Sequence, residues 1–367
     1  MNSLITNINE GIVMSIKNIF ISSLIILLGF SLFGQIARAD ASLAETRYKE
    51  KVTSVISEDF MISTEDPAIK LFVRNKRHYQ LSLFSQSNVV LFVHGATYPS
   101  ETGFDLRLDG ISWMDVLALQ GFDVYFLDLR GYGKSTRPAS MDLPANLNPP
   151  IVNTDIAALD YAAAAKWVRE RRNIDKLNVI GHSWGTAITS LYATREPQHV
   201  HKLVLYAPVW NRQTPSLTDS GGALGAYRVV TIEQARKRKE TGLRPGVKPQ
   251  PDAWFEKWAQ ETFTSDPVGS SANPKFVRAP NGVIEDSRKY WGAGKPMIDP
   301  SDIKVPTLLV LGEWDADTPP YMAQNLFPLL TNAHPKKLSV LSRGTHGMMN
   351  EIERFHLFTE VFHFLNN

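Results

Sequence analysis

Residues 177–188 read Leu177-Asn178-Val179-Ile180-Gly181-His182-Ser183-Trp184-Gly185-Thr186-Ala187-Ile188. The first four residues are apolar except for Asn178, and such a near-continuous apolar run is typical of a strand buried on both faces of a parallel sheet. A helical pattern begins after Ser183, so the serine lies in a tight strand-to-helix turn. Such a turn holds the serine in a strained conformation with its hydroxyl exposed at the helix N-terminus, and the flanking glycines avoid a steric collision. The alternative is an ordinary glycine turn that contains a serine, which the adjoining strand and helix disfavour.

Short apolar runs alternate with longer helical stretches on both sides of this turn. This alternation predicts an α/β fold with a mostly parallel eight-stranded sheet flanked by helices, and sites in such a sheet lie at the carboxyl ends of the strands. We expect strands at 51–60, 69–74, 89–93, 124–129, 177–180, 203–206, 307–311 and 338–341, and helices at 155–172, 184–194, 321–330 and 351–365.

The composition of the 367-residue chain is that of a globular protein, with 43% hydrophobic and 21% charged residues. Its 39 basic and 37 acidic residues give a net charge of only +2, which removes any electrostatic argument for nucleic acid as a partner. The chain has no cysteine, so a disulfide framework, a cysteine-ligated metal site and a thiol nucleophile are excluded.

Residues 1–39 have the layout of a secretory signal peptide. Residues 19–34 carry no charge, Lys17 precedes them, and Ala37-Arg38-Ala39 forms a small-x-small cleavage pattern before Asp40. The apolar core is short for a membrane span. We therefore expect an exported protein, periplasmic or secreted, with no stable membrane insertion after cleavage. The alternative is an uncleaved anchor that tethers the same domain to the membrane.

The rest of the chain divides into a core and an insertion. Residues 40–210 and 301–367 are expected to form the two parts of the core, and residues 211–300 an inserted, mainly helical cap. Most of the aromatic residues of this cap segment are expected to form its own small core, and a few of them to line a pocket over Ser183. Its basic run Arg236-Lys237-Arg238-Lys239 reads as a solvated helix face, with anion binding as the alternative.

Four motifs, in order along the chain, resemble those of the α/β-hydrolase superfamily. His94-Gly95-Ala96 follows one predicted strand, Asp128-Leu129-Arg130-Gly131-Tyr132-Gly133-Lys134-Ser135 follows the next, and the serine turn comes third. Gly312-Glu313-Trp314-Asp315 and Gly344-Thr345-His346 complete the set. The sequence resembles this family from about Phe72 to the C-terminus, above all its cap-bearing bacterial esterase, proline-iminopeptidase and haloperoxidase-like members. The resemblance implies a serine hydrolase.

The resemblance also implies the catalytic partners of Ser183. A serine hydroxyl is a weak nucleophile at neutral pH and needs a base within hydrogen-bond reach. The family places its base on a loop after the last strand, which is where His346 lies. The family's spacing from Gly312 selects Asp315 as the orienting acid, with Asp317 and Glu313 as alternatives. Asp317 precedes Thr318-Pro319-Pro320, where a role at a helix start is the simpler explanation.

Two backbone donors would stabilise an oxyanion formed at Ser183. One is the N–H of Trp184, and the resemblance implies that the other is the N–H of Ala96. We expect no cofactor, because the loop at Arg130–Gly133 lacks the dinucleotide-binding spacing. We also expect no metal, because three loop carboxylates (Glu313, Asp315 and Asp317) are more often a solvated edge than a metal site.

The expected function is hydrolysis of a small or medium carboxylic ester, a small-molecule substrate, through an acyl-enzyme. The alternatives are an aminopeptidase of proline-iminopeptidase type, a haloperoxidase or perhydrolase, and a non-enzymatic ligand-binding protein on the same fold. Two departures from the iminopeptidase pattern favour an ester. The loop His94-Gly95-Ala96-Thr97-Tyr98-Pro99 is shorter, and the cap around Arg236 is basic where those enzymes use acidic residues.

The signal-peptide interpretation predicts a defined N-terminus. N-terminal sequencing or mass analysis of the exported protein is expected to show Asp40 as the first residue, because cleavage follows Ala39. Recovery of the intact N-terminus in the membrane fraction would instead support the anchor.

Overall fold

The computed structural model describes residues 48, 49 and 51–367. The predicted signal peptide, residues 1–39, lies outside the described residues, so its cleavage stays a prediction. Within the described part, no helix combines the length and the apolar character that crossing a membrane requires.

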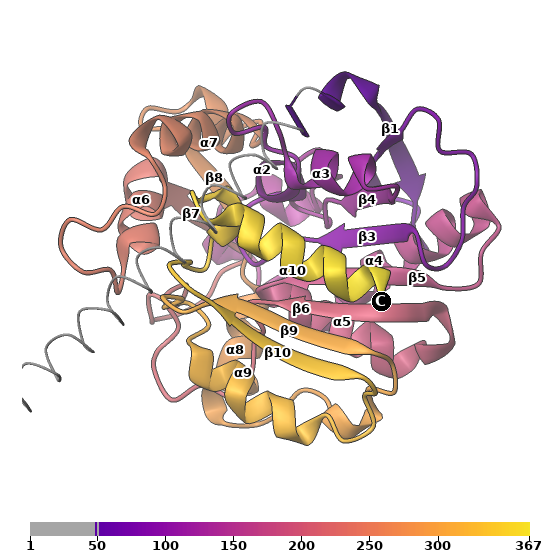
Figure 1. The fold of residues 1–367 in the computed structure, drawn as a ribbon. Coiled ribbons are helices and arrows are strands. Elements are labelled where there is room, and N and C mark those ends of the chain that lie inside the picture. Colours follow the sequence, from indigo (N-terminus) through magenta and orange to yellow (C-terminus); the bar gives the residue numbers. More distant parts are fainter. Residues whose placement is uncertain (1–47, 50) are drawn as a thin grey trace, which may run out of the picture. The chain divides into compact units, whose positions relative to one another are not determined.

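In the described part of the chain, eight strands form one mixed sheet in the order β1-β2-β4-β3-β5-β6-β9-β10 (Figure 1). β2 is antiparallel to both of its neighbours, β1 and β4. All other neighbouring strands of this sheet are parallel. The predicted mostly parallel α/β sheet is confirmed. Its strands are β1 (Val55–Ser63), β2 (Lys70–His78), β3 (Val89–Val93), β4 (Asp123–Leu127), β5 (Leu177–His182), β6 (Val200–Tyr206), β9 (Thr307–Gly312) and β10 (Lys336–Leu341).

Helices cover both faces of this sheet. α4 and α5 lie on one face, and α3 and α10 on the other, where Trp113 stacks on Phe358 with 5.0 Å between ring centroids (Figure 1). The central strands β3 and β5 are buried along their whole length, which explains their continuous apolar sequences. The α-helices are α2 (Ser100–Phe104), α3 (Trp113–Leu119), α4 (Thr154–Arg172), α5 (Trp184–Arg195), α6 (Ile232–Glu240), α7 (Asp252–Thr264), α8 (Gly282–Lys289), α9 (Pro320–Leu326) and α10 (Arg354–Asn366).

The cap segment, residues 211–300, connects β6 to β9, which are neighbours in the sheet. It contains the helices α6, α7 and α8. It also contains a two-stranded antiparallel sheet of β7 (Tyr227–Thr231) and β8 (Phe276–Pro280), which the sequence analysis did not anticipate. Paired residues of these two strands lie 45 or more positions apart in the sequence, so no turn motif predicts their pairing. The boundaries 211 and 300 themselves stay a prediction.

The parallel strands bring several loops to one edge of the sheet. The segments that follow β3, β5, β9 and β10 all leave from carboxyl ends of parallel strands, so they lie at the same edge. These segments carry Ala96, Ser183, Asp315 and His346, respectively.

Candidate active site

Ser183 occupies the turn between β5 and α5 with φ 56° and ψ −123°, a conformation that non-glycine residues rarely adopt. A Cβ at Gly181 would lie 2.3 Å from the Gly185 carbonyl oxygen, and a Cβ at Gly185 would lie 2.6 Å from that of Val93. Both positions therefore require glycine. The Ser183 N–H donates to the Tyr206 carbonyl at 2.9 Å, which helps to hold the strained residue in place.

The loop after β3 is fixed by a buried histidine. The Leu129 N–H donates to His94 Nε2 at 3.1 Å, so Nδ1 carries the proton and donates to the Gly95 carbonyl at 2.7 Å. Burial lowers the pKa of His94 to about 4, which keeps the ring neutral at physiological pH. His94 therefore braces the backbone of this loop.

The next carbonyl of this loop, that of Ala96, accepts two side-chain hydrogen bonds. Tyr132 donates its hydroxyl at 2.9 Å, and Arg228 of β7 donates Nη2 at 2.6 Å. Arg228 also donates to the Thr97 hydroxyl at 2.9 Å. Within residues 51–367, neither the Ala96 N–H nor the Trp184 N–H has a hydrogen-bond acceptor, so both donors are available to a ligand.

His346 is oriented by Asp315. Its Nδ1 lies 3.0 and 2.9 Å from the two carboxylate oxygens, so Nδ1–H donates and Nε2 is left as the acceptor. The Thr318 N–H and hydroxyl each donate to Asp315 at 2.8 Å, which fixes the buried carboxylate. Burial alone would lower the pKa of His346, but the carboxylates of Asp315 and Asp317 outweigh it, and the pKa is raised.

The backbone of His346 is held by residues next to the serine turn. Its carbonyl accepts hydrogen bonds from Tyr206 Oη at 3.1 Å and from His182 Nε2 at 3.0 Å. The His182 ring stacks on Tyr206, with 4.6 Å between centroids. The structure thus places the side chain of His182 in a bracing position between the loops of β5 and β10.

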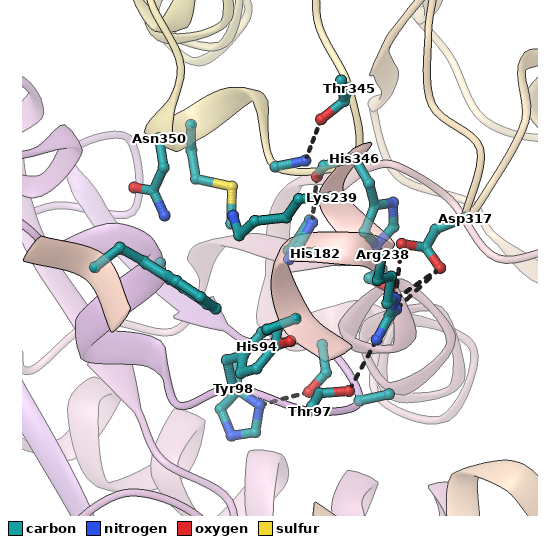
Figure 2. A pocket seen from close by; sticks show the side chains of 18 of the residues that line it. His94, Thr97, Tyr98, His182, Arg238, Lys239, Asp317, Thr345, His346 and Asn350 are labelled. Atoms are coloured by element: carbon teal, nitrogen blue, oxygen red, sulfur yellow. Dashed lines mark hydrogen bonds and ion pairs between the residues drawn. The ribbon is translucent and has the colours of Figure 1, made fainter. Parts of the chain in front are cut away.

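The expectation that Asp317 acts at a helix start is wrong. Helix α9 is preceded by Pro319 and has no side-chain cap. The Asp317 carboxylate instead accepts two hydrogen bonds from Arg238 Nε at 3.0 Å (Figure 2). The third carboxylate of this loop, Glu313, accepts from the Arg343 N–H at 2.7 Å on the surface. The three carboxylates thus point to three different partners, and no metal cluster is formed within the described residues.

The basic run in α6 was expected to be a solvated helix face, and this expectation is wrong for two of its four residues. Lys237 is exposed, but Arg238 and Lys239 are partly buried and line the same pocket as Ser183. Arg238 reaches Thr97 as well as Asp317, with Nη1 donating to the threonine hydroxyl at 3.1 Å (Figure 2). The helix is polar on nearly all sides, so its sequence does not reveal which side faces inward.

Ser183 and His346 both line one pocket that is partly open to solvent. Of the cap-segment aromatic residues, Trp258 lines the pocket, and it packs with Phe255 and Phe263 in an apolar cluster that also contains Leu106 and Leu108 from outside this segment. Most of the remaining wall is apolar or aromatic, and it includes Tyr98, Phe104, Trp314 and Met349.

Residues 88–223 match the model of a protein family described as the alpha/beta hydrolase fold. Together with the sheet and the serine turn, this match shows that the chain has the α/β-hydrolase fold, in agreement with the resemblance found in the sequence.

Among curated proteins, a proline iminopeptidase of Neisseria gonorrhoeae is 25% identical over 259 residues, which cover 65% of this chain and 77% of that protein. The chain matches much shorter parts of two others. It spans 17% of the abhydrolase domain-containing protein abhd-5.2 of Caenorhabditis elegans, at 29% identity, and 28% of a proline iminopeptidase of Heyndrickxia coagulans, at 28% identity. These matches cover 23% and 24% of this chain.

Solved structures share the fold over most of the chain. A bacterial membrane phospholipase A superposes with a TM-score of 0.57 at 18% identity and covers 95% of this chain and 97% of its own. A thermophilic esterase from Thermogutta terrifontis superposes with a TM-score of 0.52 at 17% identity, covering 84% and 98%. At these identities, the superpositions show the fold alone.

The contacts of His346 predict how its pKa responds to mutation. Asp315→Asn is expected to lower the pKa of His346 by about one to two pH units, because the imidazolium loses its nearest counter-charge. Asp317→Asn should lower it less, because that carboxylate is bonded to Arg238 instead of the imidazole. Titration of the His346 ring by NMR measures both values, with His346→Gln identifying the signal. A larger effect of Asp317→Asn would contradict the assignment of Asp315 as the orienting partner.

Proposed function

We propose that the protein is a serine hydrolase that cleaves carboxylic esters through an acyl-enzyme. The observation that carries this proposal is the pair of His346 and buried Asp315 beside a pocket that also exposes Ser183 in its strained turn. Asp315 fixes the tautomer in which Nε2 of His346 can accept a proton.

In the proposed reaction, Ser183 Oγ attacks the ester carbonyl carbon while His346 Nε2 takes the hydroxyl proton. The carbonyl oxygen becomes an oxyanion, for which the free N–H groups of Ala96 and Trp184 are the proposed donors. The tetrahedral intermediate collapses as His346 returns the proton to the leaving alcohol. Water then attacks the acyl-enzyme, again losing its proton to His346, and the carboxylic acid leaves with Ser183 restored.

An aminopeptidase is the second candidate, because two of the curated relatives are named proline iminopeptidases. The charges of the pocket argue against it. An aminopeptidase of this kind must bind the positive amino group of its substrate, whereas the lining carries Arg238 and Lys239. The one carboxylate in that lining, Asp317, is already bonded to Arg238. Parallel assays with p-nitrophenyl esters and prolyl p-nitroanilide distinguish the two candidates.

The nucleophile assignment predicts a single covalent label. An organophosphonate probe is expected to modify Ser183 alone, as peptide mass analysis would show. Ser183→Ala should abolish both labelling and ester hydrolysis, while Ser190→Ala, a buried serine on the same helix, should preserve both. Labelling that persists in Ser183→Ala would falsify the assignment.

The same mechanism predicts how the rate depends on pH. Only the neutral imidazole of His346 can accept the serine proton, so kcat/KM should rise with pH through the pKa of this histidine. Because the pKa is raised, the midpoint should lie above the ordinary value of 6.5. A rate that falls as pH increases over this range would contradict a histidine base.

The contact between Arg228 and the Ala96 carbonyl predicts an effect on catalysis from outside the core strands. Arg228→Met is expected to lower kcat about tenfold with little change in KM, because it loosens the loop that presents the Ala96 N–H. Arg236→Met, which removes a surface partner of Asp252 in the same segment, serves as the control and should leave both constants unchanged. Unchanged kcat in Arg228→Met would show that Tyr132 alone holds the loop.

A further inference from the structure

Lys239 projects into the pocket from α6 on the side of Asn350, whereas its neighbour Arg238 turns towards Asp317 (Figure 2). Its ammonium lies 4.3 Å from the centre of the Trp258 ring, a cation–π contact. Within residues 51–367, this ammonium has neither a hydrogen-bond acceptor nor an ion-pair partner within 4.0 Å. Among the described residues, none of its three N–H donors is therefore committed to an oxygen or nitrogen acceptor.

No carboxylate of the described residues forms an ion pair with the Lys239 ammonium. Asp317, the carboxylate of the pocket lining, forms an ion pair with Arg238. Lys239 therefore has no counter-charge among the residues that line the pocket. Glu351 lies close by, since a Cβ on Gly347 would be 3.3 Å from Lys239 Nζ and 3.9 Å from Glu351 Oε1, and its charge raises the pKa of Lys239 without forming an ion pair with it. Glu351 accepts hydrogen bonds from the Thr345 N–H and hydroxyl, and its burial raises its pKa. His346 adds no negative charge, so the lining around Ser183 keeps an unpaired cation.

We propose that Lys239 forms an anion subsite, and that the substrate is an ester bearing a carboxylate on its acyl chain, which this ammonium binds. The inference rests on the proposed function, since it names the substrate class of the same pocket. A carboxylate here would pair with a partly buried cation that, among the described residues, contacts an aromatic ring and has no hydrogen-bond acceptor or ion-pair partner. The apolar wall around Trp258 and Met349 suits the methylene chain between the carboxylate and the ester.

The protonation state of Lys239 agrees with this role. Burial lowers the pKa of Lys239 to about 8. The amine is therefore mostly protonated at pH 7 and becomes mostly neutral above pH 8. Glu351 and Asp317 act in the opposite direction to burial, and Arg238 in the same direction. Preference for an anionic substrate should therefore decline as the pH rises from 7 to 9, while hydrolysis of a neutral ester should not decline.

The test compares esters that differ only in charge. The mono-p-nitrophenyl ester of adipic acid is matched with p-nitrophenyl 6-methylheptanoate, whose isopropyl end has the shape of a carboxylate. The pimelate ester extends the chain by one methylene. Ser183→Ala supplies the rate of any uncatalysed hydrolysis. Lys239→Met removes the charge and keeps the apolar stem, and Lys237→Met removes the same charge from the exposed side of the same helix.

For the wild type, we expect kcat/KM for a hemi-ester to exceed that for its neutral match by about 10- to 100-fold, the range of a charged hydrogen bond. Lys239→Met should abolish this advantage and change the neutral ester by less than about threefold. Lys237→Met should behave as the wild type. A wild type without the preference, or equal losses on both esters in Lys239→Met, would overturn the subsite while leaving the serine hydrolase proposal intact.

A binding measurement separates the two proposals if no ester is cleaved. Absence of turnover together with absence of phosphonate labelling at Ser183 would refute the proposed function. Calorimetric titration of the folded protein with adipate then decides the subsite directly. Binding by the wild type and Lys237→Met but not by Lys239→Met supports it, and equal behaviour of all three overturns it.

Discussion

The site depends on one close backbone contact, the approach of Gly185 to the end of β3. The first turn of α5 comes so near that a single added Cβ would lie 2.6 and 2.7 Å from the carbonyl oxygens of Val93 and His94. This contact brings the helix N-terminus and Ser183 against the loop that carries Ala96. It also ties the position of the serine to the pairing of β3 with β5, so the geometry of the site follows from the register of the central sheet.

The remaining members of the site are held by loops that brace one another. The His346 carbonyl is bonded to residues of β5 and β6, and its ring to a carboxylate after β9. Each of these hydrogen bonds contributes only about 1 kcal/mol. Together they connect the carboxyl ends of four neighbouring strands, which gives the imidazole one orientation. A base that serves a strained serine needs such fixed placement, because small misplacements are costly in rate.

Much of this architecture could be predicted from the sequence, because it depends on local patterns. The apolar run before Gly181 identifies a buried strand, and glycine at positions 181 and 185 identifies the tight turn. In the sequence, Asp315 could be distinguished from Asp317 only by its spacing from Gly312, which is a family pattern. The structure shows how the two carboxylates differ, since Asp315 contacts the His346 ring whereas Asp317 contacts Arg238. The partners of Arg228 and Arg238 lie between 51 and 141 positions away, and no local pattern encodes such contacts.

The core and the cap segment contribute different groups to the site. The core supplies the serine, the histidine and its carboxylate, whereas Arg228, Arg238 and Lys239 all come from residues 211–300. Arg228 has only uncharged oxygen partners, and Arg238 joins Thr97 to Asp317. These cations raise the electrostatic potential where the proposed oxyanion would form, and they leave Lys239 to act on the substrate. The core therefore determines the geometry of the proposed reaction, and in our proposal the cap segment selects the charge of the substrate.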